Sequence, residues 1–119
     1  MARVLIVDDE PLLCEELLET LEFEGFDVMA AGSVNKALEH CDHSPFDVVV
    51  TDLKMPERGG LELLKELKSR NYPADIYVVS GHGADSNREQ AKDLGATECF
   101  AKPLDTDELI DAINQNLPS

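Results

Sequence analysis

An apolar run near the middle of the chain ends at an acid, and this pattern limits what the chain can fold into. Residues 46–50 read Phe-Asp-Val-Val-Val, and the run continues through Thr51 to Asp52, shortly before Met55-Pro56. Four apolar residues within five positions predict a buried strand, which a proline cannot continue because it lacks the N–H that the ladder needs. The sequence therefore predicts that Asp52 lies at the carboxyl end of a central strand, at the rim of a sheet.

Similar apolar runs alternate with segments of helical periodicity along the rest of the chain. Strands are expected at 3–7, 26–31, 46–52, 76–80 and 97–101. Helices are expected at about 11–24, 34–41, 60–70, 85–94 and 106–117. Five strands alternating with five helices predict a parallel sheet covered on both faces.

The composition of the strands also suggests their order in the sheet. The first, third and fourth are the most apolar and should be central, whereas Asp27 and Glu98 interrupt the second and the fifth and mark them as edges. With right-handed crossovers, the simplest arrangement is 2-1-3-4-5. The predicted fold is therefore α/β, a flavodoxin-like doubly wound five-stranded parallel sheet in that order with five helices.

Polar side chains follow the strands that are expected to be neighbours. They are Asp8 and Asp9, then Asp52, Ser80 and Lys102. Each of them alone is ordinary for a loop, but parallel strands present all their carboxyl ends at one rim, so the set should gather there. The first and third strands also flank the switch point of the predicted order, where open α/β sheets bind ligands.

This set of residues suits phosphoryl transfer to a carboxylate. Three acids at one rim repel one another unless a cation lies among them, and oxygen ligands alone favour Mg²⁺. With a lysine opposite and a hydroxyl nearby, Asp52 could accept a phosphoryl group and become an acyl phosphate. The added charge would lie beside the glycine-rich Gly81-His82-Gly83 loop and could re-order it.

With these residues, the chain resembles the receiver domain of bacterial two-component response regulators, of the chemotaxis-regulator-like kind. The similarity spans essentially residues 1–119 and rests on Val7-Asp8-Asp9-Glu10, Asp52-Leu53-Lys54-Met55-Pro56 with Gly60, Ser80-Gly81 and Lys102-Pro103. The resemblance implies that Asp52 is the phosphoacceptor. It also implies that Asp9, Asp52 and the backbone carbonyl of Lys54 bind Mg²⁺, and that Asp8 supports the metal through water.

The same resemblance implies roles for the remaining residues and for partners. Lys102 would pair with the phosphoryl group, Ser80 would be the switch hydroxyl, and the bond before Pro103 is a candidate cis peptide. The donor would be a sensor histidine kinase or a His-phosphotransfer protein. A downstream protein target or a homodimer would bind the face formed by the fourth helix, the fifth strand and the last helix. Such a domain is a signalling module that catalyses only its own phosphorylation and dephosphorylation.

The chain departs from the family pattern at three positions. Cys99 stands where the family commonly has a Tyr or Phe that moves with the switch hydroxyl, and Phe100 has the opposite strand parity. Arg58 and Gly59 stand where an apolar residue and an Asp or Asn are common. The acid site is complete, and the residues that would transmit the switch differ.

Composition excludes several other classes of function. The 119 residues fit one domain, and a formal net charge of −15 opposes binding to nucleic acid or anionic lipid. No apolar run approaches a membrane span, so no membrane insertion is expected. Three widely spaced cysteines suggest neither a disulfide framework nor a zinc site, which favours the cytoplasm.

Three alternatives compete with the receiver hypothesis. An aspartate-nucleophile phosphatase needs a second acid two residues after the nucleophile, where this chain has Lys54. A flavin-binding electron carrier would place the FMN phosphate among acids that repel it. A receiver-like module that is never phosphorylated would not need the complete set of acids, serine and lysine.

Overall fold

The computed structural model describes residues 2–53, 59–80, 85–101 and 104–116, with the side chains of 85–88 left out. Strands and helices alternate along the chain, as predicted. They are β1 (Arg3–Val7), α1 (Pro11–Phe23), β2 (Asp27–Ala31), α2 (Val34–His43), β3 (Val48–Asp52), α3 (Gly60–Ser69), β4 (Asp75–Ser80), α4 (Asp85–Asp93), β5 (Glu98–Ala101) and α5 (Thr106–Asn116).

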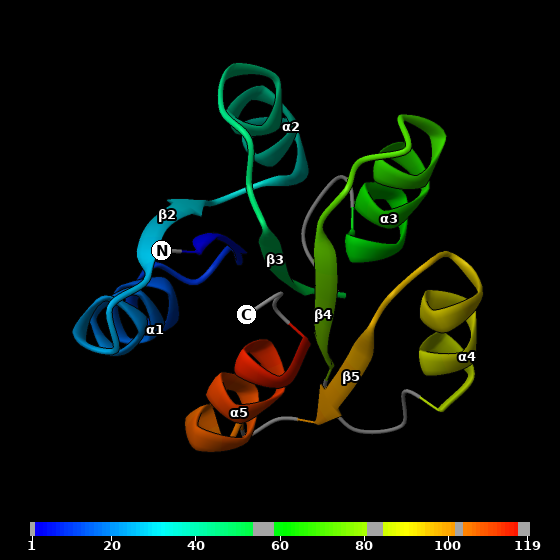
Figure 1. The fold of residues 1–119 in the computed structure, drawn as a ribbon. Helices are drawn as coiled ribbons and strands as arrows, with labels where there is room; N and C mark the ends of the chain where they lie inside the picture. The colour runs from blue at the N-terminus through cyan, green and yellow to red at the C-terminus, as the bar shows by residue number, and fades with distance from the viewer. Residues whose placement is uncertain (1, 54–58, 81–84, 102–103, 117–119) are drawn as a thin grey trace.

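The strands form one parallel sheet in the order β2-β1-β3-β4-β5, which confirms the predicted doubly wound topology. Helices α1 and α5 cover one face of the sheet, and α2, α3 and α4 cover the other (Figure 1). Exposed Asp27 and Glu98 lie on the two edge strands, as their charge predicted.

The central strands supply side chains alternately to two cores. Leu5 and Val49 pack with residues of α2 and α3, whereas Val4 and Val50 pack with residues of α1 and α5. All five residues of β3 are buried, as expected of a strand covered on both faces. Cys14 of α1 joins the second core with 8% of its surface exposed.

Local signals in the sequence set most of the element ends. Ser33 caps α2 by accepting a hydrogen bond from the Lys36 N–H, and Asp105 accepts one from the Asp107 N–H at the start of α5. Strand β2 begins at Asp27, one residue later than predicted. The Phe26 N–H instead donates to the Leu21 carbonyl oxygen and closes the end of α1, around a Gly25 with a φ of 100°.

Candidate functional site

Three carboxylates meet where β1 and β3 end. Asp8 and Asp9 follow β1, and Asp52 is the last residue of the neighbouring strand β3. Val7 is paired with Thr51 in the register, so the residues that follow these two reach the same rim of the sheet. One carboxylate oxygen of each acid lies within 4.8 Å of those of the other two. The structure thus brings together the three acids that the sequence singled out.

These acids differ in burial and in their hydrogen bonds. Asp52 is 7% exposed, whereas Asp9 is exposed and Asp8 is intermediate. The Asp8 carboxylate accepts a hydrogen bond of 2.9 Å from the Glu10 N–H, which fixes its direction. The site therefore combines a buried acid with two that reach the solvent.

Cys14 contacts the backbone of the same site. Its thiol donates to the Asp8 carbonyl oxygen over 3.2 Å. Burial, and next the negative charge of Asp8, raise the pKa of this thiol, so it stays protonated and acts as a donor in the core.

Ser80 ends β4, the strand next to β3, which ends at Asp52. Asp52 is paired with Val79, so Ser80 lies one residue further toward the rim, and it is paired with Ala101 of β5. The serine is 2% exposed, and within the described part of the chain its hydroxyl has no hydrogen-bond partner. A buried hydroxyl without a partner costs free energy, so this hydroxyl can donate to an acceptor oxygen that reaches it.

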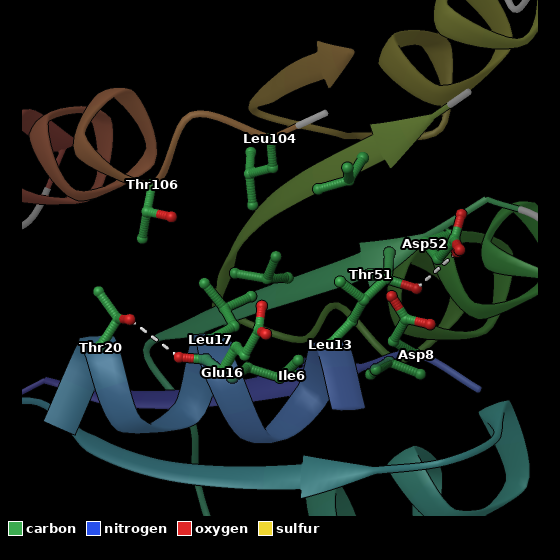
Figure 2. A pocket seen from close by; sticks show the side chains of 13 residues that line it. Ile6, Asp8, Leu13, Glu16, Leu17, Thr20, Thr51, Asp52, Leu104 and Thr106 are labelled. Atoms are coloured by element: carbon green, nitrogen blue, oxygen red, sulfur yellow. Dashed lines mark hydrogen bonds between the residues drawn. The ribbon is translucent and has the colours of Figure 1, made fainter. Parts of the chain in front are cut away.

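The acid cluster fits a hard divalent cation. Carboxylate oxygens are the donors that Mg²⁺ prefers, and a cation among them would relieve the repulsion of three negative charges. Asp8 and Asp52 also line a pocket of about 490 Å³, which continues between α1 and the residues that begin α5 (Figure 2). The pocket gives the buried acid an open side.

Two features near Asp52 were missed by the sequence analysis. Thr51 is completely buried, and its hydroxyl donates to the Asp52 carbonyl oxygen over 2.9 Å (Figure 2). Gly59 and Gly60 return the chain so close to the end of β3 that a Cβ on either would collide with a backbone oxygen there. The Gly-Gly pair was the available signal, but it was interpreted as a helix start, with Gly60 as a family motif residue and Gly59 as a departure, and not as a close backbone approach.

Several predicted site residues lie outside the described residues. They are Lys54, with its proposed carbonyl ligand, Arg58, Gly81, Lys102 and the candidate cis residue Pro103. Their roles stay predictions.

The two residues compared at the expected switch position lie on opposite faces of the sheet. Cys99 packs against the core beneath α2, α3 and α4, and Phe100 packs against the other core, where its ring centroid is 6.2 Å from that of Tyr77. This confirms that Phe100 has the wrong parity to replace an aromatic at residue 99.

Comparisons with known proteins agree with this geometry. Residues 4–114 match the family described as the response regulator receiver domain. Sporulation initiation phosphotransferase F of Bacillus subtilis is 33% identical over 98% of this chain and 94% of its own length. The transcriptional regulatory protein CpxR homolog of Haemophilus influenzae is 39% identical over 92% of this chain and 48% of its own.

The fold is also shared with solved structures. The chemotaxis protein CheY4 of Vibrio cholerae superposes with a TM-score of 0.91 at 27% identity, covering 98% of this chain and 99% of that one. The chain spans about half the length of several transcriptional regulatory proteins that it matches. Among the described helices, none has the length and apolar character needed to cross a membrane.

Proposed function

The chain belongs to the family of response regulator receiver domains, and we propose that residues 1–119 act as one such domain, with Asp52 as the phosphoacceptor. The observation that carries this proposal is the approach of Asp8, Asp9 and Asp52 to within 4.8 Å, with only Asp52 buried at a strand end. A buried, backbone-fixed carboxylate is suited to be the nucleophile, and the two more exposed acids are suited to hold a cation beside it.

In the proposed reaction, a carboxylate oxygen of Asp52 attacks the phosphorus of the donor. The new O–P bond makes an acyl phosphate, while the bond from phosphorus to the leaving group breaks and its electron pair departs with that group. Asp9, Asp52 and the Lys54 carbonyl would hold Mg²⁺, with Asp8 supporting it through water. The bound ion would supply positive charge next to the phosphoryl oxygens. Attack on the same phosphorus by water or by a second acceptor would break the bond to Asp52 and release its carboxylate.

Ser80 and Lys102 would respond to the new group. The buried Ser80 hydroxyl has no partner among the described residues, so it is available to donate to a phosphoryl oxygen. Lys102 follows Ala101, the last residue of β5, in the sequence and would contribute its positive charge. Both interactions would be made with the phosphoryl group on Asp52, so they would couple phosphorylation to the position of the backbone around them.

The partners would be those of a cytoplasmic two-component system. A sensor histidine kinase or a His-phosphotransfer protein would supply the phosphoryl group. The output surface would be the face made by α4, β5 and α5, because β4 ends at Ser80 and the chain then leads into α4. That face would bind a downstream protein or a second copy, and the net charge of −15 opposes direct contact with nucleic acid.

Phosphorylation by a small donor tests the proposal without knowledge of the kinase. We expect acetyl phosphate with Mg²⁺ to add one phosphoryl group, seen in the intact mass, because the acid site itself prepares the acceptor. The Asp52→Asn variant and an EDTA-treated sample should stay unlabelled. Asp47→Asn is the matched control, since this acid lies at the other end of β3 and binds the Arg3 N–H over 2.8 Å. Full labelling of Asp52→Asn would refute the assignment.

A further inference from the structure

We propose that Thr51, Gly59 and Gly60 are positioning residues that clamp the backbone of the acceptor, so that the Asp52 carboxylate is held against Asp8 and Asp9. This inference rests on the proposed function. It assigns a role in the reaction to one residue that carries a hydroxyl and to two that carry no side chain.

The first part of the clamp is the Thr51 hydroxyl. It donates to the Asp52 carbonyl oxygen over 2.9 Å, and Thr51 has no exposed surface (Figure 2). A buried hydrogen bond of this kind cannot be exchanged for one to water without local opening. It therefore restricts the rotation of the peptide group that joins Asp52 to Leu53.

The second part is the return of the chain at Gly59 and Gly60. The Gly60 N–H donates to the Leu53 carbonyl oxygen over 2.9 Å, and a Cβ at Gly60 would collide with the Asp52 carbonyl oxygen. A Cβ at Gly59 would come within 2.6 Å of the Leu53 carbonyl oxygen. The Gly59 φ of −97° is open to any residue, so glycine is required here by the close approach and not by the backbone angles.

The neighbouring strand holds the same peptide from its far side. The Leu53 N–H donates to the Val79 carbonyl oxygen over 3.2 Å, and the Leu53 side chain is 6% exposed. The Asp52 carbonyl oxygen is thus held by Thr51 and the Leu53 carbonyl oxygen by Gly60, while the Leu53 N–H is held by Val79 across the sheet. Together these contacts oppose rotation of the backbone on the carboxyl side of Asp52.

Such restraint matters because phosphoryl transfer depends on position. The attacking oxygen must stay in line with the leaving group, and a misplacement of about 1 Å can cost about a hundredfold in rate. Contacts with the backbone of the acceptor set that position without touching the phosphoryl group.

The test compares single variants for phosphorylation by acetyl phosphate at saturating Mg²⁺. Thr51→Val keeps the shape and removes the hydroxyl, and we expect its maximal rate constant to fall about tenfold, with the apparent KM for the donor unchanged. Thr51→Ser keeps the hydroxyl and should recover most of the rate. Gly59→Ala and Gly60→Ala should lose about as much as Thr51→Val or more, because backbone atoms must move.

Gly32→Ala is the matched control, since its Cβ would have no atom within 4 Å. It should be labelled at the parental rate. All rates are measured well below each melting temperature, so that loss of stability alone does not lower them. If an alanine variant fails to fold, the Thr51 pair still decides the matter.

The outcomes distinguish failure of the proposed clamp from failure of the proposed function. If the parent and Gly32→Ala are labelled on Asp52 and Thr51→Val is labelled at the same rate, the clamp is refuted and the proposed function stands. A slow Thr51→Val that Thr51→Ser does not rescue would also overturn it, since the hydroxyl would then not be the cause. Absence of labelling in the parent would remove the proposed function and the clamp with it.

Discussion

Acidic residues at the two ends of the parallel sheet differ in the groups that surround them. At the amino end, Arg3 donates from Nε to Asp27 over 3.1 Å and from its backbone N–H to Asp47, while Arg70 bonds Asp42 over 2.7 Å. At the carboxyl end, Asp8, Asp9 and Asp52 are gathered within 4.8 Å of one another. The acids at the amino end bond partners from other elements and help to hold the fold, whereas the three acids at the carboxyl end form a cluster that fits a cation.

The amino end is also closed by uncharged contacts. The Tyr72 hydroxyl accepts a hydrogen bond of 2.9 Å from the Phe46 N–H, and the Arg3 guanidinium lies 5.0 Å from the centre of the Phe46 ring. The polar groups named here have partners from the chain itself. The buried Ser80 hydroxyl at the carboxyl end has none among the described residues, so the difference extends beyond the acids.

The largest expected effect comes from removing one acid at the carboxyl end. Mg²⁺ should stabilise the parent by about 2.7 kcal/mol at one hundred times its Kd, because it binds the folded form. Asp9→Ala should lose this gain and should melt higher than the parent in EDTA, since one repelling charge is gone. Thermal unfolding with Mg²⁺ and with EDTA measures both changes.

An acid from the amino end provides the control. Asp42→Ala loses its contact with Arg70 and should keep the full Mg²⁺ response. A metal-free Asp9→Ala that is less stable than the parent would contradict the idea that repulsion is stored among the three acids.

A smaller effect is expected from a neutral group at the amino end. Tyr72→Phe leaves the Phe46 N–H without its acceptor and should lower the free energy of unfolding by about 2 kcal/mol. Burial raises the pKa of Tyr72 to about 12, so the hydroxyl is neutral at ordinary pH and the loss should be the same at pH 6 and pH 8. Urea unfolding measures it. A loss of phosphorylation in the folded variant would show that the two ends are not independent.

The smallest effect concerns Asp75, at the start of β4. Burial raises the pKa of this carboxyl, so the native state is favoured below the ordinary pKa and loses that advantage as pH rises through the raised value. Asp75→Asn should therefore raise the melting temperature slightly at pH 7 and not at pH 3. A gain of equal size at both pH values would show that the charge of Asp75 is not the cause.

The sequence predicted the fold well because its signals were local and redundant. The apolar runs fixed the strands, their relative polarity ordered them, and Ser33 and Asp105 marked helix starts that the structure confirms. The meeting of Asp8, Asp9 and Asp52 also followed, because parallel strands must place their carboxyl ends together.

The contacts around the acceptor could not be predicted in the same way. In the sequence Thr51 is one more strand residue, and only the folded structure shows that its hydroxyl donates to the next carbonyl oxygen. Gly59 and Gly60 depend on a close approach of two backbone segments, which no periodicity records. Short stretches of sequence predict where strands lie, but they do not predict distances between segments that meet in the fold.

The most direct measurement of the central claim is to locate the phosphoryl group and identify its bond. The protein labelled by acetyl phosphate is cleaved, its peptides are mapped by mass, and a parallel sample is treated with neutral hydroxylamine, which cleaves acyl phosphates and leaves phosphate esters intact. We predict that the added mass lies on the peptide that contains Asp52 and disappears with hydroxylamine. A hydroxylamine-resistant phosphate, or one on a peptide without Asp52, would contradict the account.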